Sequence, residues 1–438
     1  MSKLALLGGR PVRVKPFPGY NTIGKEEKQA VIKVLDTGLL SDFIGAYGDK
    51  FLGGVQVQTL EKQWGEYFNV KYAIAVNSAT SGLFAALGAI GIGPGDEVIV
   101  PAASMSASII GVLVYNAIPV FADLEEKLLC IDPESVRQRI TSRTKAILAV
   151  NLAGQPAALD ELMGIAKKYN LRVIEDNAQA PGALYNGRYA GTIGDMGVFS
   201  LNCHKTIQSG EGGMVVTNDP ELAQKVRLIR NHAEAVISGM PALPADISNM
   251  LGWNYRMTEI EAAISQEQLK KLSVLNQERI KRVNYLNQKL SKIKGISSPK
   301  VRDGCTHVYY VQVLHFDEKC YGVDNRTFVK AIQAEGIAPN MLWGGWVFPL
   351  YLQPLYQKQI AYGEKGCPFS CAYYGNKVDY SKGICPTVER LYAHDLIVNR
   401  LIYPPLSQND LDDIVRIFEK VAENIKDLRK QGKNERGN

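Results

Sequence analysis

The stretch FSLNCHKTIQSGEGGMVVTND, residues 199–219, places a lysine between two strand-like apolar segments. The first segment ends at Ser200, a short polar segment carries His204 and Lys205, and a glycine cluster leads into the second segment. Most lysines of a chain are solvated surface charges. A lysine at the end of a buried strand is a candidate reagent, so the meaning of Lys205 depends on the fold around it.

Upstream of this stretch, short apolar runs alternate with helical patterns from about residue 72 onward. Continuous hydrophobic strands are typical of a sheet that is covered on both faces. Helices between such strands imply parallel pairing with right-handed crossovers. The pattern therefore predicts a three-layer α/β/α domain with a mostly parallel central sheet. Its strands are expected at YAIAV (72–76), EVIVP (97–101), IPVFAD (118–123), KAILAV (145–150) and LRVIED (171–176).

After residue 219 the pattern changes to long charged helical stretches, of which 257–293 is the longest. A strand-like segment at 306–316 and an amphipathic helix at 411–428 follow. We expect a large domain over residues 1–279, which includes an N-terminal arm, and a smaller C-terminal α+β domain over residues 280–438. Residues 355–392 are rich in Tyr, Gly and Cys without periodicity, which predicts a long loop or insertion in the smaller domain.

The composition limits the possible partners and compartments. The 438 residues carry a formal net charge of +6, and the basic residues are scattered, so a nucleic-acid partner is not expected. No run approaches the roughly 18 uninterrupted apolar residues of a membrane span. The N-terminal apolar run breaks at Gly8 and Gly9, so no signal peptide is expected either. Seven cysteines, an odd number, favour a reducing compartment, the cytoplasm.

Candidate site residues follow the predicted strands, because ligands bind beyond the carboxyl ends of the strands in open parallel sheets. Ser78, Ala79 and Thr80 open a helix whose free N–H groups suit a phosphate, although an ordinary helix cap would look the same. Asp176 ends a buried strand and needs a partner, which a protonated heteroaromatic nitrogen or a structural arginine would provide equally well. In a partly dehydrated pocket Lys205 would lose proton affinity and form a Schiff base with a carbonyl. Together these groups match the needs of pyridoxal phosphate.

With these motifs the chain resembles the sugar aminotransferases of the DegT/DnrJ/EryC1/StrS family, which are pyridoxal-phosphate enzymes of the aspartate-aminotransferase fold. The resemblance extends from LALLGGRPVR (4–13) to the last helix. The motifs that carry it are long and stand in the family's order: NSATSGL (77–83), PGDEVIVPAASMSA (94–107), VIEDNAQAPGA (173–183), GDMGVFSLNCHKTIQSGEGGMVVTND (194–219), RNHAE (230–234) and GWNYRMTEIEAAI (252–264).

The resemblance implies roles for the residues around the cofactor ring. Lys205 would form the Schiff base and shuttle the proton. Asp176 would pair with the ring nitrogen, and Gln179 would reach the side of the phenolic oxygen. Met105 stands where many members have an aromatic residue that stacks on the ring, and a thioether can also pack against an aromatic face.

The resemblance also implies how the cofactor phosphate is held. Ala79, Thr80 and Ser200 would bind it, with Ser78 in range at the start of the helix. Asn254 would reach the phosphate of the neighbouring subunit's cofactor. A homodimer with shared active sites is therefore implied.

The implied reaction moves an amino group from L-glutamate or L-glutamine to a keto-sugar or keto-cyclitol, in amino-sugar, polysaccharide or antibiotic-type biosynthesis. The N-terminal segment 4–13 resembles the aminocyclitol and related branches, which favours a non-nucleotide acceptor, but the acceptor stays open. Two alternatives remain. Some members are sugar dehydratases with a histidine in place of the Schiff-base lysine, whereas counting from Ser200 to the glycines puts Lys205 at that position and His204 one residue before it. A non-catalytic protein of this fold would have lost the lysine, the aspartate or the phosphate cradle.

Three further features of the sequence allow more than one functional interpretation. Cys367, Cys371 and Cys385 lack a familiar zinc or cluster spacing, so we expect neutral thiols and no metal, although His394 is a conceivable fourth ligand. The aromatic segment WGGWVFPLYLQPLY (343–356) either shapes a sugar pocket or belongs to the core of the smaller domain. The glycine-containing loop at 39–54 is expected to wrap towards the active site and shape substrate selection.

Overall fold

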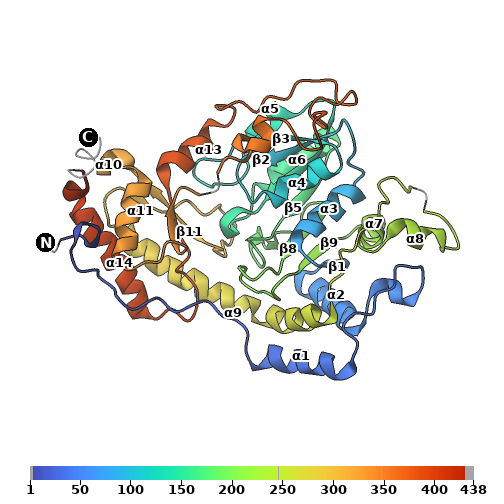
Figure 1. Cartoon of the computed structure of the whole chain (residues 1–438), viewed down its shortest axis with the longest axis horizontal. Coiled ribbons are helices and arrows are strands. Elements are labelled where there is room, and N and C mark those ends of the chain that lie inside the picture. The colour runs from blue at the N-terminus through green and yellow to red at the C-terminus, as the bar shows by residue number, and fades with distance from the viewer. Residues whose placement is uncertain (1–2, 245, 347, 430–438) are drawn as a thin grey trace.

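The computed structural model describes residues 3–244, 246–346 and 348–429, which form a larger and a smaller sheet-containing part joined by one long helix (Figure 1). The helices are α1 (Lys25–Thr37), α2 (Val55–Phe68), α3 (Ala79–Ala89), α4 (Ala107–Val114), α5 (Pro133–Arg139), α6 (Leu159–Tyr169), α7 (Pro220–Arg230), α8 (Ala233–Ser238), α9 (Glu259–Leu290), α10 (Glu318–Tyr321), α11 (Asn325–Ala334), α12 (Pro354–Gln357), α13 (Pro386–Arg390) and α14 (Gln408–Glu423). The strands are β1 (Tyr72–Val76), β2 (Glu97–Pro101), β3 (Ile118–Ala122), β4 (Thr144–Val150), β5 (Arg172–Asp176), β6 (Leu184–Tyr185), β7 (Arg188–Tyr189), β8 (Met196–Ser200), β9 (Gly213–Thr217), β10 (Ile296–Ser297), β11 (Gln312–Phe316), β12 (Leu342–Gly344) and β13 (Leu396–Asn399).

The large sheet is mostly parallel, as predicted. Its seven strands lie in the order β1-β9-β8-β5-β4-β2-β3. The five strands from β8 to β3 are parallel to one another, and β9 runs antiparallel to its neighbours β1 and β8. Strand β5 ends at Asp176, and strand β8 leads into the loop that carries Lys205. The carboxyl ends of these two strands therefore lie at the same edge of the sheet.

Both faces of the large sheet are covered, which explains why its strands read as unbroken apolar runs. On β1, Ile74 and Val76 point into a core shared with α3 and α7, whereas Ala73 and Ala75 point into a second core shared with α2 and α9. Alternate residues of a strand face opposite sides, so each strand needs apolar residues at every position here. The predicted three-layer α/β/α architecture is confirmed.

A smaller antiparallel sheet, in the order β10-β11-β13-β12, forms the second part. One face, with Leu314 and Ile397, packs with α11, α14 and the second half of α9. The other face, with Val313 and Val398, packs towards the larger part. Leu4 of the N-terminal arm lies in the core of the smaller part rather than of the larger one, so the first and last segments of the chain are packed together (Figure 1).

Residues 355–392, whose assignment as an insertion in the smaller domain stays a prediction, pack on the edge of the large sheet. The Tyr374 hydroxyl donates to the Glu97 carboxylate at 2.8 Å, and the Tyr380 hydroxyl donates to the Pro119 carbonyl at 2.8 Å. Strand β3 lies at the end of the sheet order. Its apolar side chains would be open to water there, and the tyrosine rings of this segment cover them.

The division of the chain at residue 279 stays a prediction. Helix α9 passes through that position and packs with α1 and α2 at its start and with α14 towards its end. Among the described residues, no helix is both long enough and apolar enough to cross a bilayer.

Candidate active site

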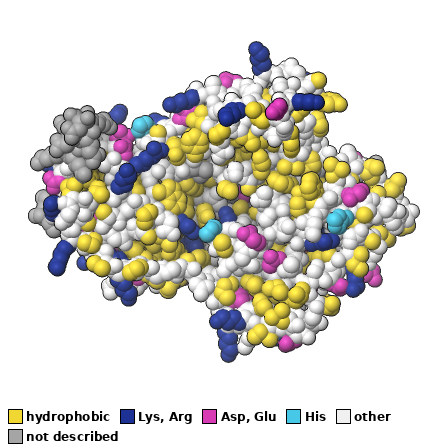
Figure 2. Space-filling model, viewed as in Figure 1, with side chains coloured by type: hydrophobic (Ala, Val, Ile, Leu, Met, Phe, Trp, Pro, Cys, Tyr) yellow, Lys and Arg dark blue, Asp and Glu magenta, His cyan; other side chains and the backbone are white. Residues whose placement is uncertain are grey.

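The residues predicted for the site come together at a cavity of about 480 Å³ between the two sheets. Hydrophobic side chains gather over the middle of the molecule where the two parts meet (Figure 2). Of the nine predicted residues, all except Asn254 line this cavity: Ser78, Ala79, Thr80, Met105, Asp176, Gln179, Ser200 and Lys205.

Lys205 lies in a tight loop between β8 and β9. The backbone N–H of Cys203 donates to the Gly210 carbonyl at 2.8 Å, which closes the loop. From the N-terminal arm, the Tyr20 hydroxyl donates to the Thr206 carbonyl at 2.5 Å. The loop that carries Lys205 is thus held by a hydrogen bond within the loop and by one from a segment far away in the sequence.

The Lys205 amine sits in an environment that weakens its hold on a proton. Its Nζ lies 4.6 Å from the centre of the Tyr310 ring, over the face of the ring. Burial lowers the pKa of Lys205 to about 8, the carboxylate of Asp176 opposes that shift, and the charge of Arg400 adds to it. A substantial fraction of the amine is therefore neutral near physiological pH, as a nucleophile or a proton carrier requires.

Asp176 is a buried carboxylate held by a hydroxyl relay. Its Oδ2 accepts from the Ser108 hydroxyl at 2.6 Å, and its Oδ1 accepts from the Ala178 backbone N–H at 3.1 Å. Because Ser108 donates to the carboxylate, its oxygen accepts from the Ser104 hydroxyl at 2.8 Å. Burial nevertheless raises the pKa of Asp176, and the two hydrogen bonds and the charge of Lys205 only partly offset this. The carboxylate thus lacks a full counter-charge within the pocket.

Glu175, the other carboxylate at this strand end, has a structural role. It is fully buried and accepts from the backbone N–H groups of Gly191, Ile193 and Gly194 at 2.6, 2.7 and 2.8 Å, and from the Asn151 side chain at 3.1 Å. These bonds anchor the loop that leads into β8. The two adjacent carboxylates therefore point to opposite sides of β5: Glu175 binds the loop, and Asp176 lines the cavity.

The predicted phosphate cradle is the start of α3. Ser78 caps this helix, and its hydroxyl accepts from the Ser81 backbone N–H at 3.1 Å. The N–H groups of Ala79 and Thr80 belong to the first turn, which has no intrahelical acceptors, and both residues line the cavity. Backbone donors at a helix start, together with the dipole, favour an anion there.

Glycine at the start of β9 lets this cradle form. A Cβ atom on Gly213 would lie 2.6 Å from the Ala79 nitrogen and 2.7 Å from the Ser78 carbonyl carbon. Ser200, which lines the same end of the cavity, pairs with Gly213 across the β8–β9 ladder. The glycines after Lys205 thus allow the strand to pass close behind the helix start.

The remaining predicted residues are placed as follows. Gln179 accepts from the Ala153 backbone N–H at 2.9 Å while its side chain lines the cavity. Met105 lines the cavity but is 64% exposed. The backbone carbonyl of Asn254 accepts from the Asn77 side chain at 3.3 Å, and the Asn254 side chain is exposed outside the cavity of its own chain.

Twelve further lining residues were not predicted as site residues, and Tyr310, Trp343, Trp346, Arg400 and His204 are among them. The aromatic segment at 343–356 was one of the open features, and its two tryptophans do reach the pocket. Tyr310 lies within the strand-like segment 306–316 and Arg400 follows a strand of the smaller part, and neither position shows a sequence pattern that marks a site residue. His204 lines the rim one residue away from the lysine.

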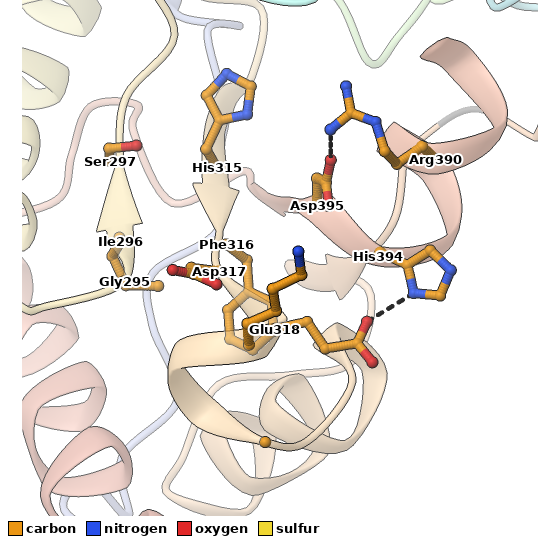
Figure 3. A pocket seen from close by; sticks show the side chains of 12 residues that line it. Gly295, Ile296, Ser297, His315, Phe316, Asp317, Glu318, Arg390, His394 and Asp395 are labelled. Atoms are coloured by element: carbon orange, nitrogen blue, oxygen red, sulfur yellow. Dashed lines mark hydrogen bonds and ion pairs between the residues drawn. The ribbon is translucent and has the colours of Figure 1, made fainter. Parts of the chain in front are cut away.

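A second cavity, of about 920 Å³, lies elsewhere, on the small sheet (Figure 3). Four of its charged or titratable side chains are paired with each other. Arg390 pairs with Asp395, and His394 contacts Glu318 at 2.6 Å through its Nδ1 (Figure 3). Apart from Asn254, the residues predicted for the site line the other cavity.

The cysteines that were weighed as metal ligands do not converge with a histidine. The Cys385 thiol is buried and donates to the Phe121 carbonyl at 3.9 Å, whereas Cys367 and Cys371 lie on the surface segment. His394 is occupied by Glu318. Over the described ranges, no group of three or more His, Cys, Asp or Glu side chains is arranged to hold a metal ion.

The cavity fits a ligand with a phosphate, a basic heteroaromatic nitrogen and an aldehyde. The helix start of α3 offers donors for the phosphate. Asp176 makes no ion pair with a described cationic side chain, and a protonated ring nitrogen would supply the missing counter-charge. Lys205 offers an amine of lowered pKa for the aldehyde. These are the groups of pyridoxal phosphate.

Comparison with known proteins agrees with this fit. The model of the DegT/DnrJ/EryC1/StrS aminotransferase family matches residues 21–415. The spore coat polysaccharide biosynthesis protein SpsC of Bacillus subtilis is 32% identical over 405 residues, which cover 91% of this chain and 95% of that protein. The L-glutamine:2-deoxy-scyllo-inosose aminotransferase of Streptoalloteichus tenebrarius is 30% identical over 439 residues, 97% of this chain and 99% of that protein. The crystal structure of an aminotransferase from Psychrobacter cryohalolentis superposes with a TM-score of 0.78 at 29% identity, covering 94% of this chain and 100% of that chain.

Proposed function

The chain belongs to the DegT/DnrJ/EryC1/StrS aminotransferase family, and on that premise we propose that it moves an amino group from L-glutamate or L-glutamine to a keto-sugar or keto-cyclitol. Its cofactor is pyridoxal phosphate, as in the family. The observation that carries the proposal is the cavity in which Lys205, Asp176 and the start of α3 face one another.

The residues of the cavity have separate roles in the proposed reaction. When bound, the cofactor supplies the electron sink that lets the α-proton of an amino acid leave. Asp176 keeps the ring nitrogen protonated by pairing its buried charge with it. Lys205 binds the aldehyde and, with a pKa of about 8, takes up and returns the proton. Ala79, Thr80 and Ser200 hold the phosphate in place, with Ser78 in range at the start of the helix.

The position of the lysine favours amino transfer over the dehydratase alternative. Lys205 lines the cavity with its amine over Tyr310, whereas His204 is exposed at the rim. A histidine cannot bind an aldehyde in the same way, so the dehydratase branch lacks this group. The intact aspartate and phosphate cradle argue equally against a non-catalytic role.

The proposal is tested with Lys205→Ala. The purified wild-type protein should carry a visible cofactor absorbance, become radiolabelled on lysine after borohydride reduction, and release a 2-oxo acid from L-glutamate or L-glutamine. Lys205→Ala should lose all three properties, while His204→Ala, the neighbouring control, should keep them. A colourless wild-type protein that cannot take up pyridoxal phosphate would refute the proposal.

The acceptor class requires its own experiment. The chain covers nearly all of a relative named as a cyclitol aminotransferase, which supports a keto-cyclitol or a related non-nucleotide acceptor in amino-sugar, polysaccharide or antibiotic-type biosynthesis. A panel of free, phosphorylated and nucleotide-linked keto-sugars and keto-cyclitols, offered with each donor, identifies the class by 2-oxo acid release.

We also propose that the enzyme is a homodimer whose active sites are shared. An apolar surface of Leu39, Ile44, Tyr47 and Leu251, each more than half exposed, lies around Asn254. Three of these residues belong to the 39–54 loop, which is held near Asn254: the Asn231 side chain donates to the Ile44 carbonyl at 3.0 Å, and Asn231 forms a backbone bridge with Asn254. Such a patch is typical of a protein–protein interface. Asn254 would reach the cofactor phosphate of the second copy.

Sharing can be tested by complementation. Lys205→Ala and Asn254→Asp homodimers should each have low activity, because the second variant places a negative charge against the phosphate. After unfolding and refolding as a mixture, heterodimers that combine both defects in one site leave the other site native, so activity should return. A monomer in sedimentation equilibrium, or no recovery on mixing, would contradict shared sites.

The compartment that we propose is the cytoplasm. All seven cysteines are free thiols in the structure, and Cys130 and Cys385 are buried. Free thiols in such number favour a reducing environment.

A further inference from the structure

Tyr20 of the N-terminal arm connects the two parts of the molecule beside Lys205. The arm begins in the core of the smaller part, at Leu4, and runs along the molecule to α1 on the larger part (Figure 1). The half-buried Tyr20 ring packs against Tyr403 of the smaller part, with 5.0 Å between the ring centres. Its hydroxyl donates to the carbonyl of Thr206, the residue after the lysine, at 2.5 Å. One side chain thus joins the smaller part to the Lys205 loop.

Arg279 of α9 lies over the face of the Tyr20 ring. Its guanidinium carbon is 4.8 Å from the centre of that ring. A cation over an aromatic face is attracted by the ring electrons, and the attraction is stronger where water is excluded, as it is around the buried Arg279. The same guanidinium donates through Nη1 to the backbone carbonyls of Tyr309 and Tyr310, each at 3.3 Å. Arg279 therefore links the arm to the segment that carries Tyr310.

The segment that Arg279 holds has a backbone conformation that needs support. Tyr309 has a φ of 54°, in the left-handed region that bulky side chains rarely adopt. Its carbonyl accepts from Arg279, and the backbone N–H of Tyr310 donates to the Ala153 carbonyl at 2.7 Å. Strained conformations of this kind persist where surrounding contacts determine them, and they cluster at functional sites. Here the conformation places the centre of the Tyr310 ring 4.6 Å from the Lys205 Nζ.

We propose that Tyr20 and Arg279 are positioning residues that hold the Lys205 amine and the Tyr310 ring against each other. The lysine loop belongs to the larger part and Tyr310 to the smaller part, so their contact depends on how the two parts are joined. Tyr20 holds the loop, Arg279 holds the turn of Tyr310, and the two side chains pack on each other. Neither lines the cavity, so neither touches the reacting atoms. This inference rests on the proposed function.

The Tyr310 ring keeps water from one side of the Lys205 amine. Burial is the main cause that lowers the pKa of Lys205 to about 8. If the contacts of Tyr20 and Arg279 are lost, water reaches the amine, and its pKa should rise towards the ordinary value of a lysine. The neutral fraction near pH 7 then falls, and the amine attacks the cofactor aldehyde more slowly. The substitutions that test this leave in place the titratable side chains that line the cavity with Lys205: Asp176, His204, Glu211, Tyr310 and Arg400.

The test measures how fast the apoenzyme captures pyridoxal phosphate at several pH values, read by absorbance. Tyr20→Phe removes only the hydroxyl, and its capture rate near pH 7 should fall about 3- to 10-fold, the loss expected for one hydrogen bond. The midpoint of its pH profile should lie at higher pH than that of the wild type, and at high pH the two rates should converge. Because a general loss of structure would slow capture at every pH, this convergence identifies positioning.

Tyr403→Phe is the matched control. It removes one hydroxyl from the same aromatic pair, but that hydroxyl donates to the Pro18 carbonyl at 3.3 Å and to the Met341 sulfur at 3.8 Å, away from the Lys205 loop. This variant should keep the capture rate and the midpoint of the wild type.

Two substitutions of Arg279 test the other half of the contact. Arg279→Gln loses the charge over the Tyr20 ring and the donors to both carbonyls, so its midpoint should move further than that of Tyr20→Phe. Arg279→Lys keeps the charge and should recover part of the difference. If Arg279→Gln does not fold, Tyr20→Phe and Arg279→Lys decide the question.

Turnover gives a second readout that separates positioning from substrate binding. With L-glutamate or L-glutamine as donor, Tyr20→Phe should lower kcat near pH 7 and leave the half-saturating donor concentration unchanged, because Tyr20 does not line the cavity. An unmoved midpoint in Tyr20→Phe and Arg279→Lys would overturn the inference. Equal slowing at every pH, or an equal effect of Tyr403→Phe, would overturn it as well.

The failure of the inference is distinguishable from that of the proposed function. If the wild-type protein does not take up pyridoxal phosphate, the proposed function falls and the inference with it. If the wild type captures the cofactor with a midpoint near the Lys205 pKa of about 8 and Tyr20→Phe behaves identically, only the inference falls.

Discussion

Ser108→Ala should weaken cofactor binding through Asp176, without touching the cofactor. The Ser108 hydroxyl donates to Asp176 at 2.6 Å, and both side chains are buried. A hydrogen bond to a buried charge contributes about 1.5–3 kcal/mol. Because this bond stabilises the ionised carboxylate, its loss should raise the already elevated pKa of Asp176 further.

The cofactor needs that carboxylate ionised, since it pairs with a protonated ring nitrogen. In the apoenzyme the carboxyl can take up a proton and so lose little by the substitution, an option that the complex does not have. The free-energy loss therefore falls on the complex, and the affinity for pyridoxal phosphate should drop about 10- to 100-fold near neutral pH. As pH rises, the ionised form returns and the defect should shrink.

Titration of the apoenzyme with pyridoxal phosphate at several pH values, read by absorbance, measures this effect. Ser104→Ala is the matched control: Ser104 is equally buried and stands one hydrogen bond further away, at 2.8 Å from Ser108. Its neutral hydrogen bond contributes about 0.5–1.5 kcal/mol, so its effect should be at most about tenfold. Equal effects of the two substitutions, or an unchanged affinity in Ser108→Ala, would refute the relay.

Three further predictions follow from the same strand ends. Glu175→Gln leaves at least two of four buried donors without an acceptor, and should lower the free energy of unfolding by about 2–6 kcal/mol in urea melts; a loss below 1 kcal/mol would contradict the anchoring role. The rate at which the apoenzyme captures the cofactor aldehyde should rise with pH to a midpoint near the Lys205 pKa of about 8, since only the neutral amine reacts; a rate still rising steeply at pH 10 would mean an unshifted lysine. Gly213→Ala puts a Cβ 2.6 Å from the Ala79 nitrogen, and should weaken cofactor affinity at least tenfold, whereas Gly210→Ala, which meets no atom within 4 Å, should strain only the loop backbone and keep most of that affinity.

Much of the site could be predicted from the sequence because it depends on strand ends. Parallel strands bring their carboxyl ends to one edge, so Ser78, Asp176 and Lys205 were expected to meet although they are distant in the chain. The order of apolar runs and helices determined that edge, and the motifs around it determined the family. The lysine position, which separates amino transfer from dehydration, was also readable directly.

Only the tertiary structure decided in which direction neighbouring side chains point and which distant segments pack together. Glu175 and Asp176 are adjacent carboxylates at one strand end, and no local pattern tells that the first anchors a loop while the second faces the cavity. The 355–392 segment has no periodicity, and the edge strand that it covers lies more than 200 residues earlier.

Tyr310 and Arg400 illustrate the same limit in the cavity itself. In sequence they stand beside ordinary strands of the smaller part, and only the packing of the two sheets turns them towards Lys205. The sequence alone determined the fold, the cofactor chemistry and the lysine that performs it, because these depend on local patterns and on strand order. The lowered pKa of that lysine and the arginine opposite it were decided by tertiary structure, because burial and charge proximity arise between segments that the sequence does not place side by side.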